Sequence, residues 1–412
     1  MNGLLADGSS PSGRLGGVLI MKPSDRLLSL DVMRGITISG MILVNNPGSW
    51  GTIFAPLEHA KWNGLTPTDL VFPFFMFIMG VSTYFSLRKY DFKFSKEAAF
   101  KICKRTVIIF AIGIGIGWFS ILCSNVFDIG NTTLTLSERF QNGIFPIDRI
   151  RILGVMQRLA LSYCGAALLV LLINHRHVLY VAGGILIAYL VILLAGNGFD
   201  LSENNVINII DRAVFSVQHM YKDTLPDGTQ IAFDPEGLLS TLPCIAHVLL
   251  GFYLGKLINA VKDNAIRIQH IFIYGTILLF AGLLLSYGCP INKKIWSPSF
   301  VLVTCGFGSL LLALLIWVID MKGKDKWSHF FESFGINPLF IYVMGGILSI
   351  LLGNIRFFSG DQVISVKGFV YNDLLLSWLP ALWASLAYAL LFVLLNWTIG
   401  HILYKKQIYI KI

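Results

Sequence analysis

Long apolar segments recur along the chain and are separated by short polar connections. Most have about the 20 residues that a helix needs to cross the hydrocarbon core of a bilayer. Helices satisfy their own backbone hydrogen bonds in lipid, so the pattern predicts an all-α fold, a polytopic transmembrane bundle of about ten helices. The predicted helices cover about residues 28–46, 69–87, 106–123, 152–173, 178–197, 238–255, 271–290, 297–319, 336–354 and 374–399.

The same pattern predicts three parts of the chain. Residues 1–27 are polar, rich in Gly and Ser, and are expected to form a flexible cytoplasmic N-terminus without a secretory signal. Residues 28–400 are expected to form one membrane core, and residues 401–412 a basic cytoplasmic tail. The connection at 198–237 is too long for a simple linker, so we expect it to be functional or partly structured.

Loop charges predict the orientation in the membrane. The connection at 88–105 carries seven Lys and Arg residues, whereas the 200–236 loop holds seven acidic residues against two basic ones. The positive-inside rule therefore predicts that both termini are cytoplasmic and that the 47–68, 124–151, 198–237, 291–296 and 355–373 loops lie outside. We expect an integral multi-pass protein of a bacterial inner membrane.

Composition excludes several classes of protein. Apolar residues make up 55% of the chain and charged residues 13%, against about 25% charged in a typical soluble domain. This excludes a mainly disordered chain and a soluble α/β enzyme. The net charge of +9 does not indicate nucleic-acid binding, because the basic residues stand in short runs that do not alternate with aromatic ones. Six cysteines without a CxxC pair predict neither a metal site nor a disulfide framework.

The strongest candidate site follows the first predicted helix. That helix ends near Asn45, an aromatic loop carries His59, and Asp69 enters the second helix ten residues later. A histidine beside a carboxylate is a common general base, because the carboxylate fixes the tautomer and stabilises the imidazolium. Asn45 is a candidate donor to a developing oxyanion. The alternative is an interfacial loop anchored by its tryptophans.

Other polar residues lie where an apolar environment makes them costly. Asp31 and Arg34 are three residues apart and share a helix face, so they can form an ion pair. This pair either orients a polar ligand or fixes the first helix against its neighbours. The arginines before and within the fourth predicted helix suit an anionic ligand, or snorkel at the helix end. The candidate substrate-binding residues are Asp31, Trp62, Asn63, Arg149, Arg151, Gln157, Arg158, Asn292, Lys293 and Asn337.

Eight motifs occur in order and together resemble one family. They are RLLSLDVMRG (26–35), VNNPG (44–48), HAKWNGLTPTDLVFPFFMFIMG (59–80), RILGVMQRLALSY (151–163), DPEGLLSTLP (234–243), PINKKIWSPSFVL (290–302), NPLFIYV (337–343) and LYKKQIYIKI (403–412). They resemble the heparan-α-glucosaminide N-acetyltransferases, a family of multi-pass membrane acetyltransferases. The string from His59 to Phe74 is highly specific, and the resemblance covers nearly the whole chain from about residue 26.

The resemblance implies an activity and a donor. The family moves an acetyl group from cytosolic acetyl-CoA to the amino group of a terminal glucosamine across the membrane. His59 falls on the family's active-site histidine, and Asn45 and Asp69 on polar residues beside it. The family resemblance also suggests a homodimer. Residues expected to hold the cofactor at the cytoplasmic side are Arg34, Lys405, Lys406 and Lys411.

The acceptor and two alternatives stay open. Lysosomal members carry a large luminal domain and one more helix ahead of this core, so we expect a bacterial-type member that acts on a free amino sugar or an envelope glycan. His59 acts either as a base or as a nucleophile that carries acetyl. The alternatives are a transporter of an amino sugar or anionic glycan, for which we find no inverted repeat, and an O-acetyltransferase.

Overall fold

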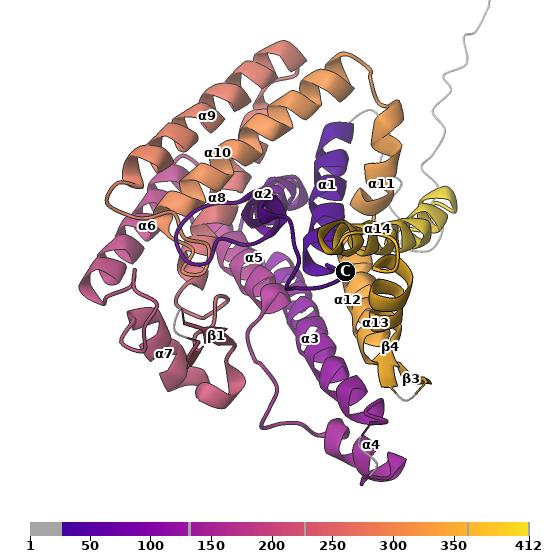
Figure 1. The fold of residues 1–412 in the computed structure, drawn as a ribbon. Coiled ribbons are helices and arrows are strands. Elements are labelled where there is room, and N and C mark those ends of the chain that lie inside the picture. The colour runs from indigo at the N-terminus through magenta and orange to yellow at the C-terminus, as the bar shows by residue number, and fades with distance from the viewer. Residues whose placement is uncertain (1–26, 131–132, 226–227, 361, 411–412) are drawn as a thin grey trace, which may run out of the picture.

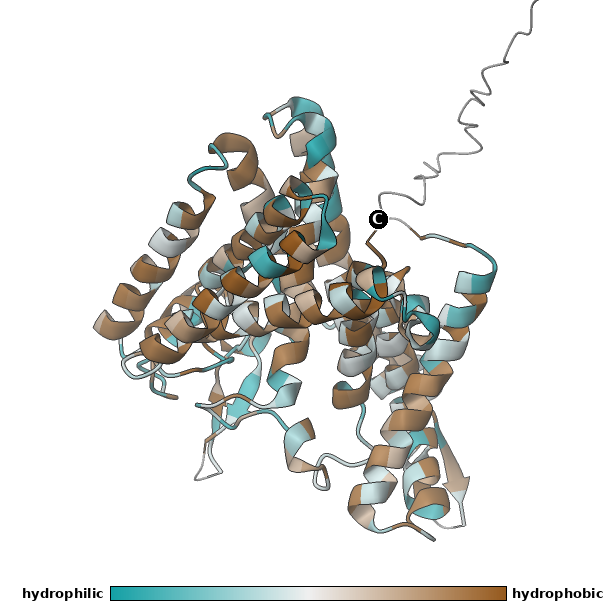
Figure 2. Cartoon of the chain, turned by 90° about the horizontal axis from the view of Figure 1, so that it is seen from above, coloured by the Kyte–Doolittle hydropathy of each residue, from teal (hydrophilic) through white to brown (hydrophobic). Residues whose placement is uncertain are grey.

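Helices dominate the fold of the chain (Figure 1). The computed structural model describes residues 27–130, 133–225, 228–360 and 362–410. Within these residues, nine helices are long and apolar enough to cross a membrane. A tenth span results if Lys326–Gly335 and Pro338–Asn354, which meet at a bend of 74°, count as one. This agrees with the predicted bundle, and Figure 2 shows apolar residues along most of these helices.

The long helices alternate with shorter elements near their ends. The α-helices are α1 (Leu28–Asn45), α2 (Pro67–Leu87), α3 (Lys96–Val126), α4 (Leu136–Ile144), α5 (Val155–Leu172), α6 (Val178–Ala195), α7 (Val206–Phe215), α8 (Thr241–Ala260), α9 (Asn264–Leu285), α10 (Pro298–Leu315), α11 (His329–Gly335), α12 (Pro338–Asn354), α13 (Val366–Gly368) and α14 (Ala381–Lys405). Short 3₁₀ or π turns are η2 (Ala55–Leu57), η3 (Arg88–Tyr90), η4 (Val217–His219), η5 (Ile316–Met321), η6 (Lys326–Ser328) and η7 (Phe369–Leu375).

Two small antiparallel hairpins interrupt the all-α pattern. Strand β1 (Lys222–Thr224) pairs with β2 (Gln230–Ala232), and β3 (Arg356–Ser359) pairs with β4 (Gln362–Ser365). Both lie in connections rather than in spans. The first hairpin and α7 give the 198–237 connection the structure expected of so long a segment. The 1–27 segment lies, apart from residue 27, outside the described residues.

Helix boundaries differ from the predicted ones where charged residues lie inside a helix. Helix α3 begins at Lys96, ten residues before the predicted start, because Ser95 accepts a hydrogen bond from the Ala98 N–H and caps it (3.1 Å). Helix α14 continues to Lys405, so the tail begins about five residues later than predicted. The hydrophobic pattern predicts only the apolar part of each helix. In the structure, α3 and α14 continue into the neighbouring basic residues.

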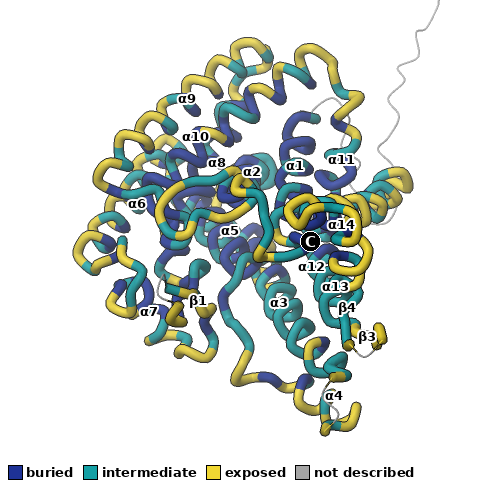
Figure 3. Tube along the Cα trace, viewed as in Figure 1, coloured by how far each residue is buried: buried dark blue, intermediate teal, exposed yellow. Residues whose placement is uncertain are grey.

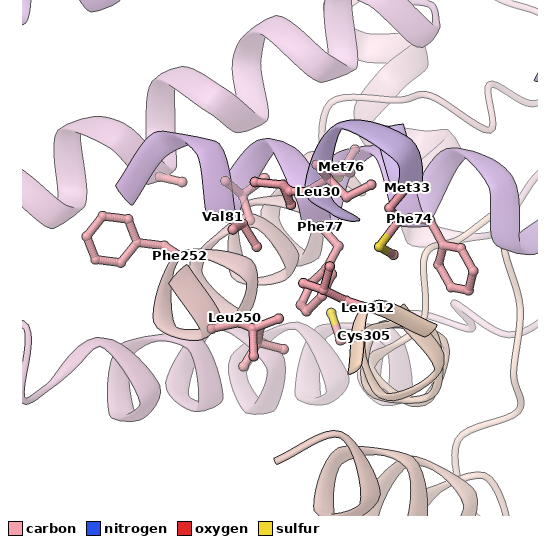
Figure 4. Close-up of a cluster of buried hydrophobic side chains, with 14 of the residues drawn as sticks. Leu30, Met33, Phe74, Met76, Phe77, Val81, Leu250, Phe252, Cys305 and Leu312 are labelled. Atoms are coloured by element: carbon pink, nitrogen blue, oxygen red, sulfur yellow. The ribbon is translucent and has the colours of Figure 1, made fainter. Parts of the chain in front are cut away.

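The core lies where α1, α2, α8 and α10 pack together (Figure 3). Phe77 of α2, Leu250 of α8 and Leu312 of α10 meet in this cluster (Figure 4). The α2–α8 contact is close because glycines face each other's backbone. A Cβ at Gly251 would lie 2.2 Å from the Phe77 carbonyl oxygen, a distance that only glycine permits.

A substitution at this contact has a large expected cost. We expect Gly251→Ala to lower stability by about 1–3 kcal/mol, because its methyl group must push apart two backbones that cannot shift independently. Gly115→Ala in α3 is the matched control, since a methyl group at that position would have no neighbouring atom within 4 Å. Thermal unfolding in detergent measures both. Equal melting temperatures for the two variants would contradict this account of the contact.

The bundle has two ends, which we name by their residues. The His59 end holds the α1–α2 loop, where the Gly64 N–H donates to the Ile291 carbonyl (2.8 Å). The tail end holds the start of α1 and the end of α14. There the Leu28 N–H donates to the Asp320 carboxylate (3.2 Å). The described ends of the chain therefore share one end of the bundle, as the alternation of ten spans predicts.

Candidate active site

His59 and Asp69 form the centre of the candidate site. The His59 Nδ1 atom lies 2.6 Å from Asp69 Oδ1. His59 belongs to the exposed loop before α2, and 44% of its side chain is accessible, whereas Asp69 is fully buried in the first turn of α2. The ten-residue spacing predicted this pair, and the structure confirms their contact.

Asp69 also holds the start of α2 together. Its Oδ2 atom accepts hydrogen bonds from the backbone N–H groups of Ala60 and Thr66 (both 3.1 Å) and from the Thr66 hydroxyl (3.0 Å). A carboxylate in the first turn satisfies N–H groups that the helix leaves unpaired. One carboxylate oxygen therefore fixes the backbone, and the other is left to face His59.

A third side chain joins this pair from the loop before α10. The Lys293 ammonium lies 3.1 Å from His59 Nδ1 and 3.5 Å from Asp69 Oδ1. Burial lowers the pKa of Lys293, and the Asp69 charge opposes that effect. The loop is rigid, because Asn292 donates to the Asn63 side chain (3.1 Å) and its own backbone N–H donates to Ser297 (3.0 Å).

The contacts assign the proton on His59. The short contact to Asp69 requires that Nδ1 carries the hydrogen, because a carboxylate only accepts. Lys293 therefore bonds with the carboxylate and not with Nδ1, and lies beside the ring. Nε2 then carries the lone pair, and the Lys293 ammonium is a distant donor to it (3.5 Å). The arrangement can take a proton from an incoming nucleophile, or can itself attack an acyl group.

The 198–237 connection packs against the His59 loop. The Trp62 indole N–H donates to the Phe199 carbonyl (2.7 Å), and its ring meets Phe233 edge to face, with ring centroids 5.4 Å apart. Lys294, next to Lys293, forms an ion pair with Asp223 in β1. This connection thus supports the loops that carry His59 and Lys293, and Trp62 acts as an anchor between them.

The arginines near α5 have protein partners. Arg151 binds Asp234 through two hydrogen bonds (2.9 and 2.5 Å) and Glu236 through a third (2.5 Å). Burial lowers the pKa of Arg151, but these carboxylates outweigh it and raise the pKa above its usual range. Arg149 is exposed and donates to the Asn142 carbonyl (3.0 Å). The structure therefore does not place Arg149 beside His59.

Arg158 and Gln157 lie deeper in the bundle. Arg158 is fully buried, donates to Ser240 and the Gly237 carbonyl, and stacks over Trp296 with 5.3 Å between the guanidinium and the ring. Its Nε and Nη1 atoms have no hydrogen-bond partner in the described part of the chain. Gln157 is buried against Gly113 of α3.

Asp211 in α7 is a further buried carboxyl group near these arginines. Burial, with a smaller contribution from the Asp234 charge, raises the pKa of Asp211 from 3.8 to about 6, although the Leu238 N–H and the Arg158 charge act the other way. The folded protein therefore binds this proton more tightly than the unfolded chain does. Stability should rise as the pH falls from about 6 to about 4, and the full penalty should apply above pH 6.

A substitution tests this dependence. We expect Asp211→Asn to remove the pH-dependent gain and to stabilise the protein near pH 7 by up to about 3 kcal/mol, because a two-unit shift has about that value. The amide oxygen can still accept from the Leu238 N–H. Thermal unfolding between pH 4 and pH 8 measures the effect. A variant with the same pH profile as the unmodified protein would contradict it.

Asn45 and the tail-end residues occupy other positions. Asn45 is exposed at the end of α1 and, within the part of the chain that the structure describes, makes no hydrogen bond to His59 or Asp69. Asp31 and Arg34 form the ion pair that their spacing predicts (3.0 Å), and Arg34 also donates to Ser82 (3.0 Å). These two residues lie near the tail end, away from the His59 loop.

Asn337 does not join Asn292 and Lys293 in one cavity. It is buried at the bend before α12, donates to the Ile408 carbonyl and accepts from the Ile410 N–H (both 2.8 Å). It therefore holds the chain after α14 at the tail end, a long-range contact that its sequence position does not reveal. Lys405 and Lys406 are exposed there, and Lys411 lies outside the described residues.

A small apolar pocket opens beside the first turns of α2. Its volume is about 10 Å³, no more than a water molecule occupies, and it is bounded by α1, α2, α5 and α12. Phe72, one turn after Asp69, lines its wall together with Tyr342 of α12. Among the described residues no group of three His, Cys, Asp or Glu side chains suits a metal ion. All six cysteines are free.

Sequence reasoning missed the acidic partners of the basic residues. Asp234 and Glu236 bind Arg151, and Asp223 binds Lys294. A signal was present, because the 200–236 loop is rich in acidic residues and the facing segments carry the arginines and lysines. The charge pattern does not show how the two segments align in space, so it could not predict which acidic residue pairs with which basic residue.

No family model matches the chain. Two curated proteins, however, are similar to it in sequence. The chain is 28% identical over 369 residues to a human heparan-alpha-glucosaminide N-acetyltransferase, with 77% of this chain covered. It is 26% identical over 443 residues to the mouse protein of the same name, with 94% covered. These matches span 52% and 61% of the relatives' own lengths. The sequence resemblance is therefore confirmed, and the chain is similar to curated proteins named heparan-alpha-glucosaminide N-acetyltransferase.

Proposed function

We propose that the protein is a membrane acetyltransferase that moves acetyl from acetyl-CoA to the amino group of glucosamine or of a terminal glucosaminide. The observation that carries the proposal is the contact of His59 Nδ1 with Asp69 Oδ1, 2.6 Å long, inside the most specific of the family-like motifs. The curated relatives are named as N-acetyltransferases, which supports the same reaction class.

The acceptor nitrogen must lose a proton as it forms its new bond. In the proposed step, the lone pair of the neutral amine bonds to the thioester carbonyl carbon, and the carbonyl electrons move to oxygen. As this bond forms, His59 Nε2 takes one proton from the nitrogen, while Nδ1–H stays bonded to Asp69. When this oxyanion collapses, the carbon–sulfur bond breaks, and the thiolate receives the proton held by His59. The buried Asp69 carboxylate stabilises the imidazolium formed in between.

Two further groups fit this chemistry. Asn45 ends α1 at the same end of the bundle and has an exposed side-chain amide, so it is our candidate donor to the oxyanion. The alternative in which His59 attacks the thioester and carries acetyl to the acceptor uses the same Nε2 lone pair. Both sequences of steps balance, because the acetyl group ends on nitrogen and the proton on sulfur.

Donor and acceptor would approach from opposite ends. We place acetyl-CoA at the tail end, where Arg34, Lys405 and Lys406 offer positive charge to its phosphates, and we assign that end to the cytoplasm by the positive-inside rule. The acceptor would then meet His59 from the outer side.

Lys293 has a separate expected effect. We expect Lys293→Met to lower kcat for acetyl transfer about 10- to 100-fold with a smaller change in KM for acetyl-CoA, because the Asp69 carboxylate, which must stay aligned with His59, then loses the ammonium group that pairs with it. Lys294→Met, which removes the ion pair with Asp223 instead, is the matched control. Equal losses in both variants would mean that loop stability, not the His59 contact, matters.

One assay tests the proposed function directly. Purified protein in detergent receives radiolabelled acetyl-CoA, with glucosamine or N-acetylglucosamine as the acceptor. We expect label transfer to glucosamine alone, because N-acetylglucosamine has no free amine and would be labelled only by O-acetylation. No binding of acetyl-CoA, together with uptake of labelled sugar into liposomes in its absence, would replace the enzyme by a transporter.

A further inference from the structure

Trp296 lies in the loop between α9 and α10, three residues after Lys293, and its side chain is buried in the bundle. Only 1% of it is accessible. Its backbone adopts a left-handed conformation (φ 52°), which strains a residue with so large a side chain. Such a conformation persists only where the surrounding structure holds it, and here the buried ring is the part of the residue that the surroundings hold.

The Trp296 ring contacts four of the long helices. The ring centroids of Phe72 in α2, His247 in α8 and Phe300 in α10 lie 5.5, 5.8 and 5.0 Å from it. The Arg158 guanidinium of α5 lies 5.3 Å from the indole ring. Contacts of both kinds are favourable at these distances. The indole N–H has no hydrogen-bond partner among the described residues, so packing holds the ring in place.

Two connections lead from this ring to the His59 site. The Trp296 backbone N–H donates to the Lys293 carbonyl (3.1 Å), so a change in the Trp296 backbone moves the Lys293 backbone. Phe72, which packs against the ring, stands one helical turn after Asp69 in α2. The ring therefore fixes both sides of the contact between the Lys293 ammonium and Asp69 Oδ1, which are 3.5 Å apart.

From this geometry we propose that Trp296 is a positioning residue for acetyl transfer, which acts by holding Lys293 against Asp69. The inference rests on the proposed function, because it assigns Trp296 a part in that reaction. Without the ring, the turn leaves its left-handed conformation, the Lys293 backbone moves with it, and the ammonium group loses its place beside the carboxylate. A role in fold stability alone would lower kcat independently of Lys293.

A double-variant cycle tests whether Trp296 acts through Lys293. We expect Trp296→Leu to lower kcat about 10- to 100-fold with a smaller change in KM for acetyl-CoA, because small displacements of aligned groups have effects of that size. In the Lys293→Met background, the same substitution should cost no more than about a further twofold, since residues that act through one another are not additive. Trp296→Phe keeps a ring in the cluster, and the same cycle with it serves if Trp296→Leu does not fold.

Trp397→Leu is the matched control. Trp397 lies in α14, away from the His59 loop, and its indole N–H likewise has no partner among the described residues. Its ring stacks on His401, with centroids 4.5 Å apart. This variant should keep the kcat of the unmodified protein in both backgrounds.

Hydrogen exchange tests the structural part of the proposal without an acetylation assay. The backbone N–H groups of Ile295, Trp296 and Ser297 donate to the Asn292 side chain (3.2 Å), the Lys293 carbonyl (3.1 Å) and the Asn292 carbonyl (3.0 Å). We expect these three amides to exchange faster in Trp296→Leu than in the unmodified protein, because opening of the turn exposes them. The control variant should exchange at the unmodified rate.

The two measurements separate this proposal from the proposed function. Unchanged exchange in the turn, or losses of kcat that add fully in the double variant, would overturn the positioning role and leave the acetyltransferase in place. No acetyl transfer by the unmodified protein would overturn the proposed function, and the positioning role with it, even if exchange in the turn is faster in the variant.

Discussion

Replacement of His59 by alanine should reduce acetyl transfer at least about 100-fold, with the protein still folded. General-base catalysis contributes about 10²- to 10⁴-fold, and the loss of a nucleophile costs more. His59 is an exposed loop residue whose main contact is with Asp69, so its removal creates no cavity in the core. Steady-state transfer from radiolabelled acetyl-CoA to glucosamine measures the effect, and thermal unfolding checks the fold.

His270→Ala is the matched control, because His270 is exposed on α9 and plays no part in the proposed chemistry. It should retain full activity. Single-turnover transfer by the His59 variant at the unmodified rate would refute the assigned role. A covalent acetyl group trapped on the unmodified protein but absent from the variant would favour the nucleophile over the base.

Replacement of Asp69 by asparagine should lower kcat about 10²- to 10⁴-fold. Asp69 Oδ2 accepts three hydrogen bonds, two from Thr66 at the start of α2 and one from the Ala60 N–H in the loop, so the amide oxygen of asparagine should take that position. The amide nitrogen then faces His59 Nδ1 and donates to it. This forces the hydrogen onto Nε2, which removes the lone pair that the reaction needs. The Lys293 ammonium also loses its countercharge.

The expected change is specific to the chemistry. The KM for acetyl-CoA should stay close to that of the unmodified protein, because the phosphates of the donor are placed at the other end of the bundle and only its thioester reaches His59. Asp128→Asn is the control, since Asp128 pairs with Arg356 near the surface (2.9 Å). A kcat for Asp69→Asn within about threefold of the control would be incompatible with the assigned tautomer. General-base catalysis contributes about 10²- to 10⁴-fold, so its loss should be far larger than that.

Sequence alone predicted the helices because lipid leaves few alternatives for an apolar segment of about 20 residues. It also predicted contacts between residues close in the chain. Asp31 and Arg34 lie three residues apart on one helix face, and they pair at 3.0 Å. His59 and Asp69 meet because the helix start between them is closed by Thr66, which binds the same carboxylate. Local geometry determines both contacts.

Tertiary structure decided the partners that are distant in the chain. Lys293 reaches His59 across 234 residues, and Asn337 binds Ile408 across 71. Hydrophobic periodicity predicts that a segment forms a helix, but not which helix it packs against or how the two are aligned along the bundle axis. The packing of α2, α8 and α10 sets this alignment. The histidine–carboxylate pair was therefore readable from the sequence, whereas the lysine that completes it was determined by the packing of helices far apart in the chain.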